Sequence, residues 1–218
     1  MKRTDSEIKT MVSDELKADT RVKETHVGVE VDRGVVTLTG TVSSYGERQA
    51  AQRAAHRVAG VLDVANDIQV KVPGSAASTD TELAQFVRRA LEWDVFVPEQ
   101  KITTTVSGGW VTLEGHVDTL SQRDAVEKAI RNLNGLVGVV NKLEVDPDVV
   151  AGDIRHAIEA ALGRHAVREA DHLSVEVRPS GKVILTGTVA SFSEKKAVLG
   201  AARSTKGVRS VADQLRIG

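Results

Sequence analysis

The stretch GVVTLTGTV at residues 34–42 decides the fold of this chain, because it occurs three times. It returns as GWVTLEGHV at residues 109–117 and as GKVILTGTV at residues 181–189. From the first glycine of each copy, the sequences align without a gap to Val70, Val145 and Ile217. The copies are about 70 residues apart, beyond the 20–50 residues of solenoid repeats, so each unit can form a small core of its own.

The residues around each copy predict two helices and three strands. The first helix of a unit begins at a capping box, Thr4 to Glu7 in unit one and Thr79 to Glu82 in unit two. In unit three the cap is assigned to Asp148 or Asp153. The first strands, at residues 27–31, 102–106 and 173–177, alternate apolar and other side chains, which is typical of a sheet with one covered face.

The second helix of each unit follows the repeated stretch and leads to a third strand. Capping boxes at residues 44–47, 119–122 and 191–194 begin this helix, and strands are predicted at 64–70, 139–145 and 211–217. A crossover through a helix returns the third strand parallel to the second. We therefore expect an α+β fold of three tandem αββαβ units, each a small three-stranded mixed sheet with two helices on one face. The predicted domains are residues 1–72, 79–146 and 148–218.

Two sets of glycines recur in the three units. Gly40, Gly115 and Gly187 stand in the second strand where a core side chain is expected, which favours a bulge or a close approach by the backbone of a helix. A ligand in the same notch is the alternative. The second helix is predicted to end at a C-cap glycine, and the three such glycines are Gly60, Gly135 and Gly207.

The composition excludes several classes of function. Cysteine is absent, so there are no disulfides, thiolate metal sites or thiol catalysis, and the net charge of −1 argues against a dedicated nucleic-acid binder. Met1-Lys2-Arg3 is followed by a polar stretch and not by the apolar core of a signal peptide, and no run is long enough for a transmembrane segment. The expected location is therefore cytoplasmic.

No catalytic constellation recurs from unit to unit. The six histidines occupy unmatched positions, so we expect no enzyme, no cofactor and no metal site. Asn66, Asn141 and Asp213 are equivalent, and a hydrogen bond at a strand edge or in a turn is favoured over a binding site at these positions.

Exposed aromatic residues are the candidates for contact with a lipid or another partner. Trp93 and Phe96 lie in the most apolar loop of the chain, and Trp110 is assigned to the uncovered sheet face. Insertion into a lipid interface is one interpretation. The alternatives are packing against a neighbouring unit and, for Phe96, capping its own core.

The repeated G-x-V-x-L-x-G-x-V stretch, the capped helix and the glycine before the third strand resemble the BON domain family (bacterial OsmY and nodulation). The resemblance covers nearly the whole chain as three tandem copies, and it implies that the motif glycines are structural. It also implies a non-catalytic role in osmotic stress, with attachment to phospholipid surfaces of the envelope. Signal-bearing relatives are periplasmic. The alternatives are a cytosolic sensor of a small ligand or of potassium, and a scaffold that self-associates through the threonine-rich open sheet face.

Overall fold

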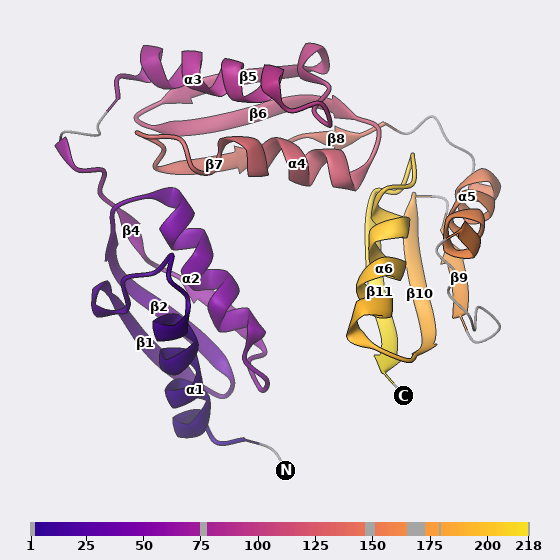
Figure 1. The fold of residues 1–218 in the computed structure, drawn as a ribbon, viewed down its shortest axis with the longest axis horizontal. Coiled ribbons are helices and arrows are strands. Elements are labelled where there is room, and N and C mark those ends of the chain that lie inside the picture. Colours follow the sequence, from indigo (N-terminus) through magenta and orange to yellow (C-terminus); the bar gives the residue numbers. More distant parts are fainter. Residues whose placement is uncertain (1–2, 75–77, 147–150, 165–172, 179, 218) are drawn as a thin grey trace. The chain divides into compact units, whose positions relative to one another are not determined.

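A computed structural model describes residues 3–74, 78–146, 151–164, 173–178 and 180–217. It contains three small sheets that share no strand. Each sheet belongs to one repeat, with a helix before its first strand and a helix before its third (Figure 1). The α+β class and the tandem αββαβ organisation expected from the sequence are therefore confirmed.

In each sheet the strand built from the repeated stretch is central. The order is β1-β2-β3 in the first sheet, β5-β6-β7 in the second and β11-β10-β9 in the third. The third strand of each unit therefore pairs with the second strand and not with the first. The third strand runs parallel to the second, as expected. The parallel pairs are β3 and β4 with β2, β8 with β6, and β11 with β10.

The first repeat comprises α1 (Asp5–Ala18), the 3-10 helix η1 (Glu24–His26), β1 (Val27–Asp32), β2 (Val35–Val42), α2 (Tyr45–Arg57), β3 (Asp63–Asn66) and β4 (Gln69–Val70). The second comprises α3 (Asp80–Trp93), the 3-10 helix η3 (Glu99–Lys101), β5 (Ile102–Ser107), β6 (Trp110–Val117), α4 (Leu120–Ile130), β7 (Gly138–Asn141) and β8 (Glu144–Val145). The third comprises α5 (Ala151–Arg164), β9 (Leu173–Val177), β10 (Lys182–Val189), α6 (Phe192–Arg203) and β11 (Ser210–Ile217).

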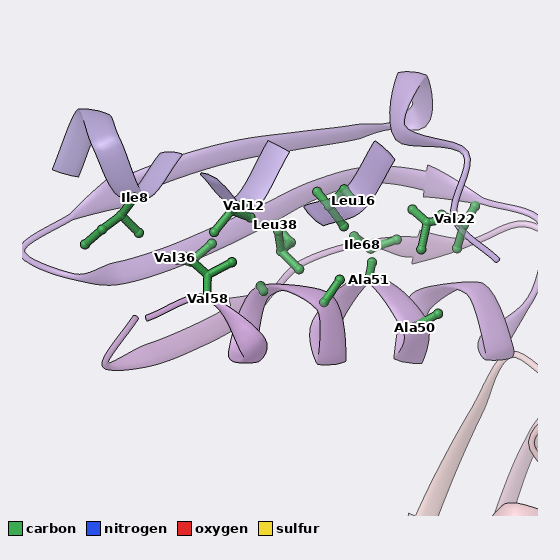
Figure 2. Packing of buried hydrophobic residues seen from close by; sticks show 13 residues of the cluster. Ile8, Val12, Leu16, Val22, Val36, Leu38, Ala50, Ala51, Val58 and Ile68 are labelled. Atoms are coloured by element: carbon green, nitrogen blue, oxygen red, sulfur yellow. The ribbon is translucent and has the colours of Figure 1, made fainter. Parts of the chain in front are cut away.

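The core of the first repeat lies between one face of the sheet and both helices. Apolar residues of α1, β2 and α2 form a single buried cluster (Figure 2). Its members on these elements are Ile8, Val12, Leu16, Val36, Leu38, Val42, Ala50, Ala51, Ala54 and Ala55. On the opposite face of β2, Val35, Thr39 and Thr41 are exposed and Thr37 is partly buried. Small alanines on α2 let this helix lie close to the sheet, and each buried Val, Leu or Ile contributes about 1.5–3 kcal/mol.

The helix starts follow the sequence, with one correction. Thr4 and Glu7 form the predicted reciprocal capping box, and Thr79 and Glu82 repeat it. In the third repeat, Asp148 lies outside the described residues. Asp153 lies inside α5, so its assignment as the cap is wrong.

The second helices share a shifted version of the predicted capping box. Ser44, Thr119 and Ser191 accept the expected backbone hydrogen bond from the residue three positions later. The returning side chain of Glu47, Gln122 or Glu194 bonds the backbone N–H one position before the cap instead. Glu47 also accepts from the backbone N–H of Lys23, which ties the start of α2 to the loop after α1.

The third strand is interrupted in the first two repeats, where a continuous strand was predicted. Asn66 Oδ1 accepts a hydrogen bond from the Ile68 N–H, and Asn141 Oδ1 accepts one from the Leu143 N–H. This Asx turn lies where two residues leave the ladder between β3 and β4 and between β7 and β8. The turn hydrogen bond expected at these positions is thus confirmed, and Asp213 makes the same bond within the uninterrupted β11.

Gly40, Gly115 and Gly187 all have positive φ, from +120° to +133°. A Cβ at Gly40 would overlap the carbonyl oxygen of His26, and one at Gly115 would overlap that of Lys101. A close backbone approach therefore explains these two glycines. His26 and Lys101 end the short 3-10 helices η1 and η3, which the sequence analysis did not foresee.

Gly60, Gly135 and Gly207 also have positive φ, but their assignment as C-caps is wrong. The helices end earlier, at Arg57, Ile130 and Arg203. The glycines lie in the turn to the third strand, against the glycine of the hairpin turn. A Cβ at Gly109 would lie 2.8 Å from the Gly135 carbonyl oxygen, and one at Gly181 would lie 2.7 Å from that of Gly207.

Candidate functional site

The loop that follows α3 carries large apolar side chains into solvent. Trp93, the last residue of α3, is 88% exposed, Val95 is 90% exposed and Phe96 is 72% exposed. Val97, the next residue, is buried. Phe96 therefore does not cap its own core, as one interpretation of the sequence had it, and its ring is available for an outside contact.

The backbone of this loop is held by local hydrogen bonds. Asp94 Oδ1 accepts from the Phe96 N–H at 3.0 Å, and the Asp94 carbonyl accepts from the Val97 N–H at 3.0 Å. The Lys101 N–H then bonds the Pro98 carbonyl at 2.9 Å and closes η3. Because the backbone is fixed on both sides, Trp93 and Phe96 are presented by a structured turn.

Phe86 extends this surface along α3 and was missed in the sequence analysis. It lies seven residues before Trp93, two helical turns away and on the same side, and it is 38% exposed. The buried face of α3 is a different stripe, formed by Leu83, Val87 and Leu91. The signal was present in the sequence as a second apolar stripe on one helix. We call Phe86, Trp93, Val95 and Phe96 the apolar tip.

The first repeat carries different chemistry at the equivalent place. Its sequence aligns without a gap with that of the second repeat, and the apolar tip corresponds to Met11, Ala18, Thr20 and Arg21. Asp19, equivalent to Asp94, is buried. Its carboxylate accepts hydrogen bonds from Arg21 Nε at 2.8 Å and from Arg21 Nη2 at 2.7 Å. These bonds hold the pKa of the Asp19 carboxyl well below its usual range.

Arg57 completes this ion-pair network. Its Nη2 donates to Asp19 Oδ2 at 3.1 Å and its Nε donates to Glu15 at 2.7 Å, which joins the end of α1 to the end of α2. The residues equivalent to Glu15, Arg21 and Arg57 are Ala90, Phe96 and Asn132. The second repeat has therefore replaced every partner of the aspartate by an uncharged residue at the place where the apolar tip projects.

Trp110 lies apart from the apolar tip. It begins β6 on the uncovered face, as expected, and is 44% exposed. Its ring lies over Gly138 of β7, where a Cβ would be 2.6 Å from Cε3 and 2.7 Å from Cη2. Such a ring over a strand glycine stabilises the sheet. The Trp110 side chain is therefore half-buried by a contact within its own repeat.

The two ends of α3 separate the aromatic residues. Asp80, at the start of α3, accepts hydrogen bonds from the N–H groups of Gly108 at 2.7 Å and Gly109 at 2.9 Å, next to Trp110. Trp93 ends the helix about 20 Å away, at 1.5 Å per residue. The structure thus brings Trp93 and Phe96 together and places Trp110 at the opposite end of the repeat.

A groove of about 590 Å³ lies at the end of the first repeat. The start of α1, the β1–β2 turn and the turn after α2 form it, with Arg3, Arg33 and the exposed Leu62 among its lining residues. Arg3 Nη1 donates to the Ala59 carbonyl at 2.6 Å, and the Asp5 carboxylate accepts from the backbone N–H groups of Arg33 and Gly34.

The described ranges contain no group of three or more His, Asp or Glu side chains placed to hold a metal ion. His165 and His172 lie outside them. Among the helices of the described ranges, none has the length and apolar character that crossing a membrane requires.

Comparison with known proteins identifies the repeated unit. The family model described as the BON domain matches residues 4–72, 79–147 and 151–218. Osmotically-inducible protein Y of Escherichia coli (strain K12) is 31% identical over 146 residues, which cover 64% of this chain and 72% of that protein. An uncharacterized protein in the gshII 5′ region of Anaplasma centrale is 31% identical over 123 residues, 53% of this chain and 81% of that protein.

Among solved structures, the C-terminal domain of CdsD, a structural protein of the type III secretion system of Chlamydia trachomatis, is similar at 14% identity and a TM-score of 0.28. That match covers 96% of both chains, but so low a score carries no weight for function. The family model, in contrast, matches nearly the whole sequence as three successive copies, and the sheets and helices of each copy agree with it. The chain therefore belongs to the BON domain family and consists of three BON domains in tandem.

Proposed function

We propose that this protein is a non-catalytic BON protein of the osmotic stress response, and that it attaches to phospholipid surfaces through the apolar tip of its second domain. Membership of the family and the similarity to a protein named as osmotically inducible support the stress-related role. The observation that carries the lipid contact is the exposure of Trp93, Val95 and Phe96 on one structured turn.

The energy of this contact suits a reversible attachment. Transferring a large apolar side chain from water to an apolar medium yields about 1.5–3 kcal/mol, so the three most exposed residues of the tip offer roughly 4–9 kcal/mol. Part of this is offset by the lost freedom of the bound protein. The protein would therefore associate with a membrane and leave it again, as a peripheral protein does.

Co-sedimentation of the full chain with vesicles of phosphatidylethanolamine and phosphatidylglycerol tests the proposal. We expect the wild-type protein to sediment with vesicles and the double variant Trp93→Ala/Phe96→Ala to remain in the supernatant. Phe192→Ala is the matched control, because Phe192 is 71% exposed but stands alone at the start of α6. Absence of sedimentation by the wild type, or equal sedimentation of all three proteins, would refute the lipid contact.

A sensor of a small ligand is the second candidate function, and the groove in the first domain favours it. Its volume falls within the range of small-molecule sites. Titration with potassium and with small anionic metabolites, followed by amide NMR shifts, would test this candidate. Shifts that cluster at Arg3, Arg33 and Leu62 are the expected result, and an unchanged spectrum would remove it.

A further inference from the structure

The charges near the apolar tip balance one another. Arg88, Arg89 and Glu92 lie on the same end of α3, Asp94 lies within the turn itself, and Glu99 follows the turn. Lys101, beyond the turn, forms an ion pair with Asp118 at 3.2 Å. Residues 79–146 as a whole carry 7 basic and 11 acidic side chains, a net charge of −4. In the part of the chain that the structure describes, no cluster of cations accompanies the exposed aromatic rings.

This balance is unlike that of proteins that recognise anionic headgroups. A juxtamembrane basic cluster gains about 1 kcal/mol per Lys or Arg at an anionic surface, and salt screens that attraction. The apolar tip lacks such a cluster, whereas the transfer of its side chains out of water depends on apolar area and not on charge.

We infer that the apolar tip recognises hydrocarbon exposed at defects in a loosely packed lipid surface, and that headgroup charge contributes little to its binding. This inference rests on the proposed function and names the kind of surface that the same site takes. The Trp93 and Phe96 side chains are the inserting groups, and Phe86 and Val95 cover the boundary around them. Bulky rings enter a lipid layer where gaps between headgroups already expose acyl chains.

The size of the tip favours lipid over a second copy of the chain. An aromatic side chain buries 150–250 Å² when fully covered, so two largely exposed rings, one partly exposed ring and one valine offer roughly 500 Å². A stable protein interface buries about 800 Å² on each partner. Insertion into lipid has no such requirement, because every apolar group that leaves water adds to the binding.

The first domain supplies a variant whose local fold is already known. Replacing Trp93, Val95 and Phe96 by their equivalents gives the triple variant Trp93→Ala/Val95→Thr/Phe96→Arg, in which the new arginine faces Asp94 as Arg21 faces Asp19. Trp110 remains in this variant, so its fluorescence reports whether the second domain is still folded.

The test compares three kinds of vesicle by the fluorescence of Trp93 in the full chain with Trp110→Phe, which keeps a ring over Gly138. The vesicles are dioleoyl phosphatidylcholine, the same lipid with added dioleoyl phosphatidylglycerol, and gel-phase dipalmitoyl phosphatidylcholine, whose chains are tightly packed. We expect a blue shift with affinities within about twofold on the first two, unchanged by salt, and at least about tenfold weaker binding to the gel phase.

The possible results distinguish the inference about exposed hydrocarbon from the proposed lipid contact itself. Binding that requires phosphatidylglycerol and disappears with salt would overturn the inference but keep the lipid contact, and so would equal binding to the gel phase. No binding to any vesicle would remove the proposed function itself. In co-sedimentation, the triple variant should lose binding to dioleoyl vesicles while Phe192→Ala keeps it, and retention by the triple variant would overturn the assignment of the tip.

Discussion

Replacing Gly115 by alanine should unfold the second BON domain while the other two domains remain folded. Gly115 stands in the central strand β6 with φ +125°. An added Cβ would overlap the carbonyl oxygen of Lys101 and lie 3.1 Å from its carbonyl carbon and 3.3 Å from the Cα of Ile102. All three atoms belong to the backbone, so no rotation of a side chain can relieve the contact.

The expected cost has two parts. A residue with a Cβ in a sparsely populated backbone region costs about 1–3 kcal/mol. Relieving the overlap requires the end of η3 and the start of β5 to move away from β6, which weakens their hydrogen bonds at about 1 kcal/mol each. The total of roughly 3–5 kcal/mol matches the whole stability of a domain of this size, about 3–5 kcal/mol.

The chain provides its own reporter for this experiment. It has two tryptophans, Trp93 and Trp110, and both lie in the second domain. Urea unfolding of the full chain, followed by tryptophan fluorescence, therefore reports the second domain alone, while far-ultraviolet circular dichroism reports all three. We expect Gly115→Ala to show unfolded fluorescence without denaturant and to keep most of the helical dichroism.

Gly108→Ala is the matched control. Gly108 also has positive φ, +57°, but no heavy atom lies within 4 Å of an added Cβ. It should therefore lose only about 1 kcal/mol, the cost of the backbone conformation alone. If Gly115→Ala were no less stable than Gly108→Ala, the close backbone approach would not be the reason for the recurring glycine.

Three further changes test other contacts. Asp19→Asn should destabilise the first domain by about 2–3 kcal/mol at neutral pH, because charged hydrogen bonds from two arginines are lost, and hydrogen exchange of α1 measures it. Since the bonds with Arg21 lower the pKa of Asp19, the wild-type advantage is complete above the unfolded value of about 3.9 and disappears as the pH falls through the lower folded value. Asp80→Ala should lower the urea midpoint of tryptophan fluorescence by the equivalent of about 1–2 kcal/mol, because the β5–β6 turn loses its two bonds to α3. Gly200→Ala in α6, where an added Cβ meets no neighbour within 4 Å, should raise the melting temperature of the third domain by the equivalent of about 0.5–1 kcal/mol.

Each of these predictions has a result that would contradict it. Asp19→Asn should match the wild type at strongly acidic pH, and a difference that persisted there would show that the carboxylate is not the stabilising group. For Asp80→Ala, an unchanged midpoint would mean that the turn is held without α3. A fall in stability of Gly200→Ala would indicate a contact of that helix face within the folded chain.

The sequence alone determined the features that depend on neighbouring residues. The capping box of Thr4 and Glu7 and the Asx turn at Asn66 form between residues two or three positions apart. The repeat itself established three copies of one αββαβ unit. The parallel third strand also followed, because the crossover through a helix leaves it no other direction in one sheet.

Contacts between distant residues were decided only by the tertiary structure. The alternation of side chains along β6 predicted that Trp110 lies on the open face of the sheet. The contact of its ring with Gly138 depends, however, on which residue of β7 lies beside Trp110. The third strand was expected to be continuous in every repeat, but it is interrupted in the first two and continuous as β11 in the third, although all three repeats make the same Asx bond.

The candidate site also combines features that the sequence predicted with others that only the fold determined. The sequence marked Trp93 and Phe96 as apolar residues of one loop, but it left open whether they pack inside or project into solvent. In the structure Val97 is buried and Phe96 is exposed. Burial is a property of how the helix, the loop and the sheet close on one another, and no local pattern determines which of two neighbouring apolar residues enters the core.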